Sequence, residues 1–132
     1  MSLQQADFIQ IINVYRKVIA KVLCRLELSF STAELKKMAL SDAVATSFFG
    51  TCVAGKFKSL LSDMRIALSL GEVPQSPRIE TRDQQLRMFY KISPNFELEI
   101  RPVSILFVGI DNWHRVHRVE IIGIHGNGAD RL

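Results

Sequence analysis

The first 28 residues carry apolar side chains at the three- and four-residue spacing of one helix face. These positions are Phe8, Ile11, Ile12, Tyr15, Val18, Ile19, Val22, Leu23 and Leu26, and the basic residues Lys17, Lys21 and Arg25 recur on the opposite side. The stripe is wider than one packed layer needs, which predicts burial on two sides. It fits a central helix of the domain, a homodimer seam or a groove for a protein partner. The candidate interface residues are Phe8, Ile12, Tyr15, Ile19 and Val22.

Two further helices are predicted before residue 72. Ser31 followed by Glu34 is the pattern of a helix N-cap with a capping box, and Ser41 and Asp42 indicate a restart after the second helix. A third helix is expected from about residue 54 to residue 70, with Gly71 as its C-terminal stop. The core positions of these helices are Leu35, Met38, Ala39, Phe57, Leu60, Leu61, Met64, Ala67 and Leu68. Residues 74–77, PQSP, then form a linker.

After the linker the apolar period changes from helical to two, the period of a strand. Residues 86–92 and 96–101 alternate in this way and are joined through Ser93-Pro94-Asn95 as a hairpin. The register places Tyr90 opposite Leu98 and Met88 opposite Ile100. It also places Lys91 opposite Glu97, which is a favourable cross-strand pair. Two independent patterns therefore agree on this hairpin.

Two more strands are expected towards the C-terminus. Residues 103–110 are apolar on both faces, which predicts a central strand that begins after a break at Pro102. A turn near Asp111 and Asn112 leads into a last strand over residues 115–124. The predicted fold is one α+β domain, in which about three N-terminal helices pack on one face of a C-terminal antiparallel sheet of three to four strands. Its parts are a helical half (1–73), the linker (74–77), a β half (78–126) and a tail (127–132).

Composition and charge place few further limits on this domain. The chain has 132 residues, 48% of them hydrophobic, and a formal net charge of +4. Residues 1–77 hold nine Lys and Arg against six Asp and Glu, a balance of +3, and residues 78–132 hold eight against seven, a balance of +1. This permits a nucleic-acid partner without requiring one. Cys24 and Cys52 lie among apolar residues and predict buried thiols, so we expect a cytoplasmic protein. A membrane partner is not expected, because the longest apolar stretch is interrupted by charges.

The segment GTCVAGKF, residues 50–57, fits seven of the eight positions of the phosphate-binding pattern G-x-x-x-x-G-K-[ST]. The last position is Phe57, which cannot bind magnesium. A phosphate loop also needs parallel strands with long crossovers, for which the chain is too short. The segment is interpreted as a helix junction of small residues, although the apolar run that ends at Asp111 keeps the nucleotide alternative open.

The densest polar cluster of the chain lies at residues 111–120. Asp111, His114, His117 and Glu120 recur every third residue, and a helix would align them as metal ligands. The β-branched residues nearby favour a strand, on which that alignment is lost. The sequence therefore predicts no metal site, no cofactor and no catalytic residue.

The same cluster is a candidate surface for nucleic acid or another anion. It places cations beside an aromatic residue, and the hairpin register sets Arg87 opposite Arg101, which is unfavourable without an anion nearby. The candidate residues are Arg87, Arg101, Trp113, His114, Arg115, His117 and Arg118. A solvated surface or a protein interface remains the alternative.

Two segments, LRMFYKIS (86–93) and RVEIIGIHG (118–126), look similar in style to strands of small ribonuclease toxins of the RelE/ParE type. The predicted element order departs from that family, because no strand precedes the helices and the helical region is longer. We therefore do not assign the chain to it. The leading hypothesis is a non-enzymatic binding or regulatory module that associates with a protein partner or with itself, possibly with nucleic-acid contact. The alternative is a metal-independent ribonuclease that uses the basic hairpin surface.

Overall fold

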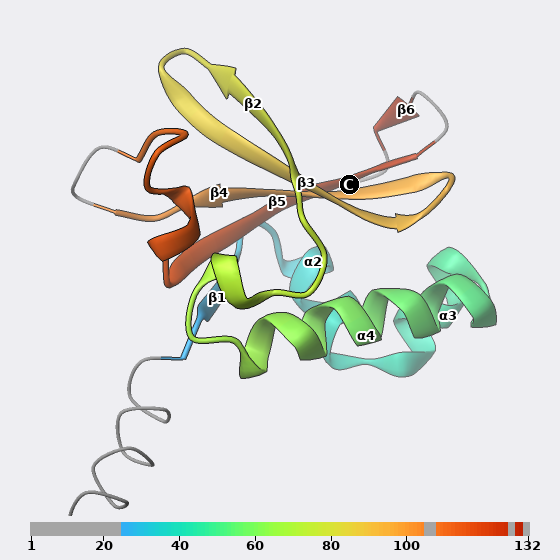
Figure 1. The fold of residues 1–132 in the computed structure, drawn as a ribbon. Coiled ribbons are helices and arrows are strands. Elements are labelled where there is room, and N and C mark those ends of the chain that lie inside the picture. The colour runs from blue at the N-terminus through green and yellow to red at the C-terminus, as the bar shows by residue number, and fades with distance from the viewer. Residues whose placement is uncertain (1–24, 105–107, 127–128, 131–132) are drawn as a thin grey trace, which may run out of the picture.

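The computed structural model describes residues 25–104, 108–126 and 129–130. In chain order the elements are β1 (Glu27–Phe30), α2 (Ala33–Leu40), α3 (Asp42–Phe49), α4 (Thr51–Ile66), the 3-10 helix η1 (Leu70–Glu72), β2 (Arg78–Arg82), β3 (Gln85–Ser93), β4 (Phe96–Pro102), the 3-10 helix η2 (Trp113–Arg115), β5 (Arg118–Gly126) and β6 (Ala129–Asp130). The helices form a layer beneath the twisted sheet (Figure 1). This confirms the α+β class.

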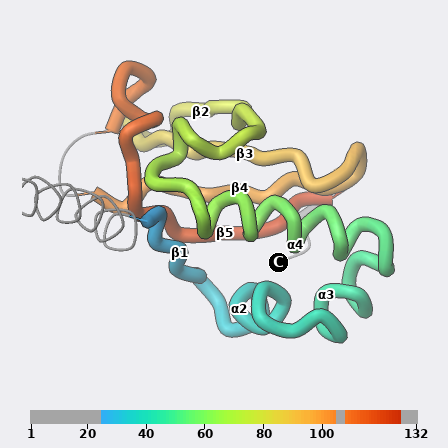
Figure 2. The backbone as a smooth tube through the Cα atoms, turned by 60° about the horizontal axis from the view of Figure 1, so that its bottom comes forward, coloured from blue at the N-terminus to red at the C-terminus, as the bar shows by residue number. Residues whose placement is uncertain are grey.

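The sheet has more strands than the sequence predicts, and one of them is parallel. Its order is β1-β5-β4-β3-β2, and the two-residue β6 also pairs with β5. All neighbours are antiparallel except β1, which runs parallel to β5. Figure 2 shows α2, α3 and α4 together on one side of the strands. The sheet is therefore mixed, with five principal strands instead of three to four.

The N-terminal strand corrects the predicted first helix, which was expected to continue to Leu28. Leu26 is buried, and the next residue, Glu27, begins strand β1. The Glu27 amide donates a hydrogen bond, 2.8 Å long, to the carbonyl of His117, which directly precedes β5. A helical spacing cannot reveal such a partner, because pairing with a strand 90 residues away is not local. The interface candidates Phe8, Ile12, Tyr15, Ile19 and Val22 lie outside the described residues.

Capping residues fix the starts of α2 and α3. The side chain of Thr32, not of Ser31, accepts the hydrogen bond from the Leu35 amide, whereas the Ser31 hydroxyl donates to the Ile122 carbonyl in β5. The expected restart is confirmed, since Ser41 caps α3 through the Val44 amide. These caps satisfy amides that a helix start otherwise leaves without partners.

Helix α4 supplies most of the helical share of the core. Phe57, Leu60, Leu61 and Met64 are buried as predicted, and each contributes about 1.5–3 kcal/mol of burial free energy. The helix ends at Ile66, four residues earlier than expected. Gly71 is not its stop. A Cβ on Gly71 would lie 2.9 Å from the carbonyl oxygen of His114, so this glycine lets η1 and η2 approach closely.

The β3–β4 hairpin has the predicted register. Met88 pairs with Ile100, Tyr90 with Leu98 and Lys91 with Glu97. The residues that face the helices are buried: Leu86, Met88, Tyr90, Ile92, Leu98, Ile100, Val119, Ile121 and Ile124. The opposite side of the sheet, called the open face below, carries the alternating charged residues of β2, β3, β4 and β5.

The predicted central strand at 103–110 is wrong for the residues that the structure describes. Val103, Ser104 and residues 108–110 lie outside any strand, and Val103 and Ile110 are exposed. Proline lacks the amide that a ladder needs, and Pro102 is the last residue of β4. The last strand, expected over 115–124, is β5 over 118–126, preceded by η2.

Candidate functional site

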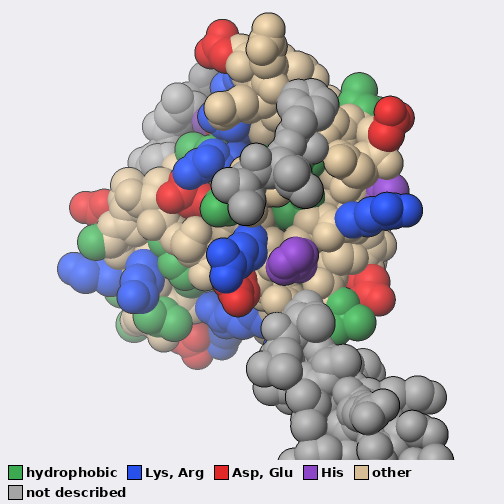
Figure 3. Space-filling model, turned by 90° about the vertical axis from the view of Figure 1, so that its left-hand side faces the viewer, with side chains coloured by type: hydrophobic (Ala, Val, Ile, Leu, Met, Phe, Trp, Pro, Cys, Tyr) green, Lys and Arg blue, Asp and Glu red, His purple; other side chains and the backbone are tan. Residues whose placement is uncertain are grey.

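The predicted basic residues gather at one end of the open face, around two adjoining cavities. The turn cavity, about 410 Å³, is lined by the β2–β3 turn, Arg87, Arg101 and residues 102–104 and 108. The loop cavity, about 220 Å³, is lined by Arg115, His117 and Arg118 together with Val103, Ser104 and Val108. The last three residues line both cavities. Figure 3 shows Lys, Arg and His side chains distributed over this end of the molecule.

The structure separates the other two predicted residues from these cavities. Trp113 is half-buried and packs on the hydrophobic core, and its ring lies edge-on to His114 at a centroid distance of 6.1 Å. His114 is exposed above Gly71. Five of the seven predicted residues therefore share one site, and the tryptophan has a structural role beside it.

The repulsion predicted between Arg87 and Arg101 is offset by carboxylates of the protein, which are the nearby anions that this pair was expected to need. Arg87 Nε lies 3.4 Å from Glu99 Oε2, and Arg101 Nε donates to Glu120 Oε1 at 2.6 Å. Glu99 keeps only 7% of its side chain exposed and also contacts His125 Nε2 at 2.6 Å. Register explains this, because β5 places Glu120 directly opposite Arg101.

The ion pairs at this end have a common geometry. Arg118 Nε contacts Glu27 Oε2 at 3.0 Å, so Arg87, Arg101 and Arg118 all meet a carboxylate through Nε. In Arg101 and Arg118 the two Nη groups have no bond to another described residue. The carboxylate therefore orients the guanidinium through Nε. The two Nη groups, called the outer edge of the guanidinium below, can still form two parallel hydrogen bonds with a phosphate.

Arg78, elsewhere on the same face, shows the opposite arrangement. Its Nη1 binds Glu80, and its Nη2 and Nε bind Glu97 at 3.0 and 3.4 Å. The hydrogen bond to Glu97 raises the pKa of Arg78, and the hydrogen bond from Arg78 lowers the pKa of Glu80. The guanidinium also covers Phe89, 4.3 Å from the ring centroid. All three nitrogen atoms of the Arg78 guanidinium are thus bound to carboxylates, so Arg78 is a matched control for Arg101 and Arg118.

Arg115 and His117 line the loop cavity and have no ion pair with any described residue. Both are exposed. His117 is held in place by its main chain, because its carbonyl accepts the hydrogen bond from Glu27. Placed beside Arg118, the two side chains complete a basic rim.

The GTCVAGKF segment is a helix junction, as the sequence analysis favoured. Gly50 has a φ of 85°, ends α3 and begins α4, and the residues from Thr51 onward are helical. A helix precedes the junction where a phosphate loop needs a strand, and Phe57 is 1% exposed in the core. Cys52 is exposed on α4, which corrects the prediction of a buried thiol at this position, whereas Cys24 lies outside the described residues.

The four candidate metal ligands fall in different environments. Asp111 lies in a turn, His114 in η2, His117 in a connecting segment, and Glu120 in β5 bound to Arg101. Within the described part of the chain, no group of three or more His, Cys, Asp or Glu side chains is placed to hold a metal ion.

Sequence reasoning missed the acidic partners Glu27, Glu99 and Glu120 and the turn residues Gln84 and Gln85. The alternation of 96–101 placed Glu99 and Arg101 on one face, which was the available signal. The pairing of β4 and β1 with β5, which supplies Glu120 and Glu27, had no local signature.

The chain matches no protein-family model, no curated protein and no solved structure. The described residues form an α+β domain in which helices cover one face of the sheet and leave the other face open among these residues. None of the helices described is both long enough and apolar enough to cross a bilayer. Among the described elements a strand, β1, precedes the helices α2, α3 and α4, but no similarity to a solved structure links the chain to the ribonuclease toxins.

Proposed function

We propose that the protein is a non-enzymatic binding module that holds the phosphate backbone of a nucleic-acid strand against Arg101, Arg115 and Arg118. The observation that carries this proposal is the Nε-only pairing of Arg101 and Arg118. The planar fork of a guanidinium group loses less entropy for each hydrogen bond to a phosphate than a lysine ammonium does. Arg115 adds a charge without a carboxylate partner among the described residues.

The second part of the proposal is association with a protein partner or a second copy of the chain through residues 8–22. It is supported by the wide apolar stripe of that segment in the sequence. A cytoplasmic location belongs to the same proposal, because an exposed free thiol at Cys52 suits a reducing compartment.

The test measures fluorescence anisotropy of labelled single-stranded RNA and DNA oligonucleotides over a range of salt concentrations. The double variant Arg101→Ala/Arg118→Ala should weaken binding by about 100-fold or more, because two charge-assisted bonds are lost and each contributes about 1.5–3 kcal/mol. It should also reduce the slope of log affinity against log salt by about 0.7 for each lost phosphate contact. Arg78→Ala removes the same charge from the same face and should change affinity by less than about 3-fold, since only screened long-range attraction is lost.

Equal losses in the double variant and in Arg78→Ala would mean that only net charge matters and would refute the site. Absence of strand binding by the wild type at low salt would refute the nucleic-acid function itself. Oligomeric state, measured by light scattering, tests the association part separately. Substituting Ile12 and Ile19 by Asp should abolish a dimer.

A metal-independent ribonuclease is the second candidate, and one observation favours it. His117 lies in the loop cavity between Arg115 and Arg118, where an imidazole could accept a proton beside cations that stabilise a phosphate. Under this alternative, wild-type protein cleaves RNA but not DNA of the same sequence in the presence of a chelator. His117→Ala would then abolish cleavage while it retains RNA affinity. An intact RNA strand after prolonged incubation with stoichiometric protein would eliminate the ribonuclease.

A further inference from the structure

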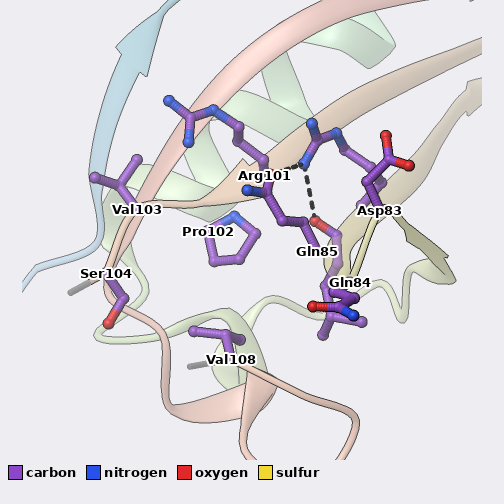
Figure 4. Close-up of a pocket in the computed structure, with 10 residues that line it drawn as sticks. Asp83, Gln84, Gln85, Arg101, Pro102, Val103, Ser104 and Val108 are labelled. Carbon is purple, nitrogen blue, oxygen red and sulfur yellow. Dashed lines mark hydrogen bonds between the residues drawn. The ribbon is translucent and has the colours of Figure 1, made fainter. Parts of the chain in front are cut away.

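The turn cavity has the composition of a nucleotide site. Figure 4 shows Asp83, Gln84 and Gln85 on one side, Val103 and Ser104 on the other, and Arg101 with Pro102 between them. Its volume of about 410 Å³ lies within the range of small-molecule sites, about 300–1,000 Å³. Apolar surface and polar groups are both present, so the cavity can contact a planar ring and also bind its edge.

The apolar part of the lining comes from residues next to the core. Leu86 is 3% exposed, Pro102 and Val108 are half-buried, and Val103 borders them. Pro102, Val103 and Val108 offer a surface on which an unstacked base can lie.

The polar part is arranged by Arg87. Its Nη1 donates to Gln85 Oε1 at 3.4 Å and to the Leu86 carbonyl at 3.3 Å (dashed in Figure 4). Because the Gln85 oxygen is occupied as an acceptor, its NH₂ group is left to donate to a ligand. Gln84 next to it can donate and accept.

The backbone of the turn provides an independent observation. Asp83 and Gln84 connect β2 to β3, and both have positive φ, 50° and 64°. A two-residue hairpin turn of this kind prefers glycine at its second position, and glutamine there costs about 1 kcal/mol. No hydrogen bond from the Gln84 side chain to another described residue offsets this cost. A ligand that needs the Gln84 amide would explain a residue that the turn itself disfavours.

We propose that the turn cavity holds one unstacked nucleotide, with its base against Pro102 and Val108, its base edge on Gln84 and Gln85, and its phosphate on the outer edge of Arg101. This inference rests on the proposed function, because Arg101 also belongs to the strand-binding surface. It goes further by assigning a base-contacting site and by predicting a preference for single strands. In a duplex, the base would be stacked and paired and could not enter.

The decisive variant is Gln84→Gly, which removes the amide and relieves the backbone. It should raise the melting temperature and still weaken binding of a single-stranded RNA oligonucleotide about 5- to 10-fold, since contacts to one base are lost. The salt dependence should stay unchanged because no charge is removed. Thr81→Ala, on the same hairpin but outside the cavity lining, is the matched control and should bind like the wild type.

Three competitors complete the test. A strand with an abasic position at the preferred register should bind the wild type about 5- to 10-fold less tightly and Gln84→Gly without a further loss. A duplex of the same sequence should compete at least about 10-fold more weakly than the single strand. Free AMP that displaces the strand at equal affinity would identify a free nucleotide, instead of a strand, as the source of the ligand.

The outcomes separate this inference from the proposed function. If Gln84→Gly binds like the wild type while Arg101→Ala/Arg118→Ala does not, the nucleotide site is wrong and the phosphate-binding surface stands. If duplex and single strand compete equally, the base-contacting role is overturned. If neither Gln84→Gly nor Arg101→Ala/Arg118→Ala changes affinity, both proposals fail.

Discussion

Replacing Tyr90 by Phe is expected to stabilise the protein, contrary to the usual effect of a core substitution. Tyr90 lies in β3, faces the helices and is 0% exposed. Its hydroxyl has no hydrogen-bond partner among the residues that the structure describes. Phe has the same ring and removes only this oxygen, so packing is preserved.

The magnitude follows from the desolvation of one hydroxyl group. Leaving a buried polar group without a partner costs about 1–3 kcal/mol. Removing the oxygen recovers most of that cost but opens a small void, so we expect the free energy of unfolding to rise by about 1–2 kcal/mol. For a domain of this size, that corresponds to an increase in melting temperature of about 3–8 °C.

The same burial predicts a pH dependence. Desolvation raises the pKa of Tyr90 above that of an unfolded tyrosine, which is about 10. Above pH 10 the unfolded chain releases this proton while the folded chain retains it, so the free energy of unfolding falls as pH rises. Below pH 10 both states keep the proton and this residue adds no slope. Tyr90→Phe should therefore reduce the loss of stability between pH 10 and 11 by about 1 kcal/mol.

Urea unfolding followed by circular dichroism at pH 7, 10 and 11 measures both effects. A Tyr90→Phe variant that is less stable than the wild type by 1 kcal/mol or more would falsify the assignment of an unsatisfied hydroxyl. An unchanged alkaline slope would show that Tyr90 ionises as readily in the folded state as in the unfolded chain.

Three further substitutions test the structural account of the junction and the open face by the same urea measurement. Gly50→Ala should lower the free energy of unfolding by about 1–3 kcal/mol, because φ is 85° at this position. Gly55→Ala should raise the free energy of unfolding by about 0.5–1 kcal/mol, because residue 55 lies inside α4 and a Cβ there would meet nothing within 4 Å. Equal effects at the two glycines would contradict a helix junction. Glu99→Ala should lower the free energy of unfolding by about 2–4 kcal/mol, since the substitution leaves Arg87 and His125 without their shared carboxylate. A loss below about 1 kcal/mol would mean that solvent fully replaces this carboxylate.

Local patterns predicted the parts of this fold that local contacts determine. The β3–β4 hairpin was predicted to the exact residue pairs, because alternation and one cross-strand charge pair select the same register. The buried stripe of α4 followed from its 3.6-residue period. In both cases the signal lies within 16 residues or fewer of chain.

The errors arise where a distant partner or a single residue overrides the pattern. Apolar residues 103–110 resemble a buried strand, yet Pro102 ends β4 and the described part of that run lies outside the sheet. Leu26 and Leu28 continue a helical spacing, but Leu28 lies in β1, which pairs with β5, and Leu26 directly precedes that strand. The candidate site was predicted only in part, because some of its residues come from strands that are distant in the sequence. Its cations are visible in the sequence, while the carboxylates that orient them come from β1, β4 and β5.

Strand β1 connects the two surfaces on which the proposed function depends. Residues 1–24, which contain the proposed interface, lead directly into Leu26 and Glu27. Glu27 donates its amide to the carbonyl of His117 and holds Arg118 through its carboxylate. Any movement of β1 caused by association would therefore shift two members of the basic rim. The parallel β1–β5 pair provides a physical route by which binding of a partner through residues 8–22 could change the affinity for an anionic strand, because both events would act on the same four-residue ladder.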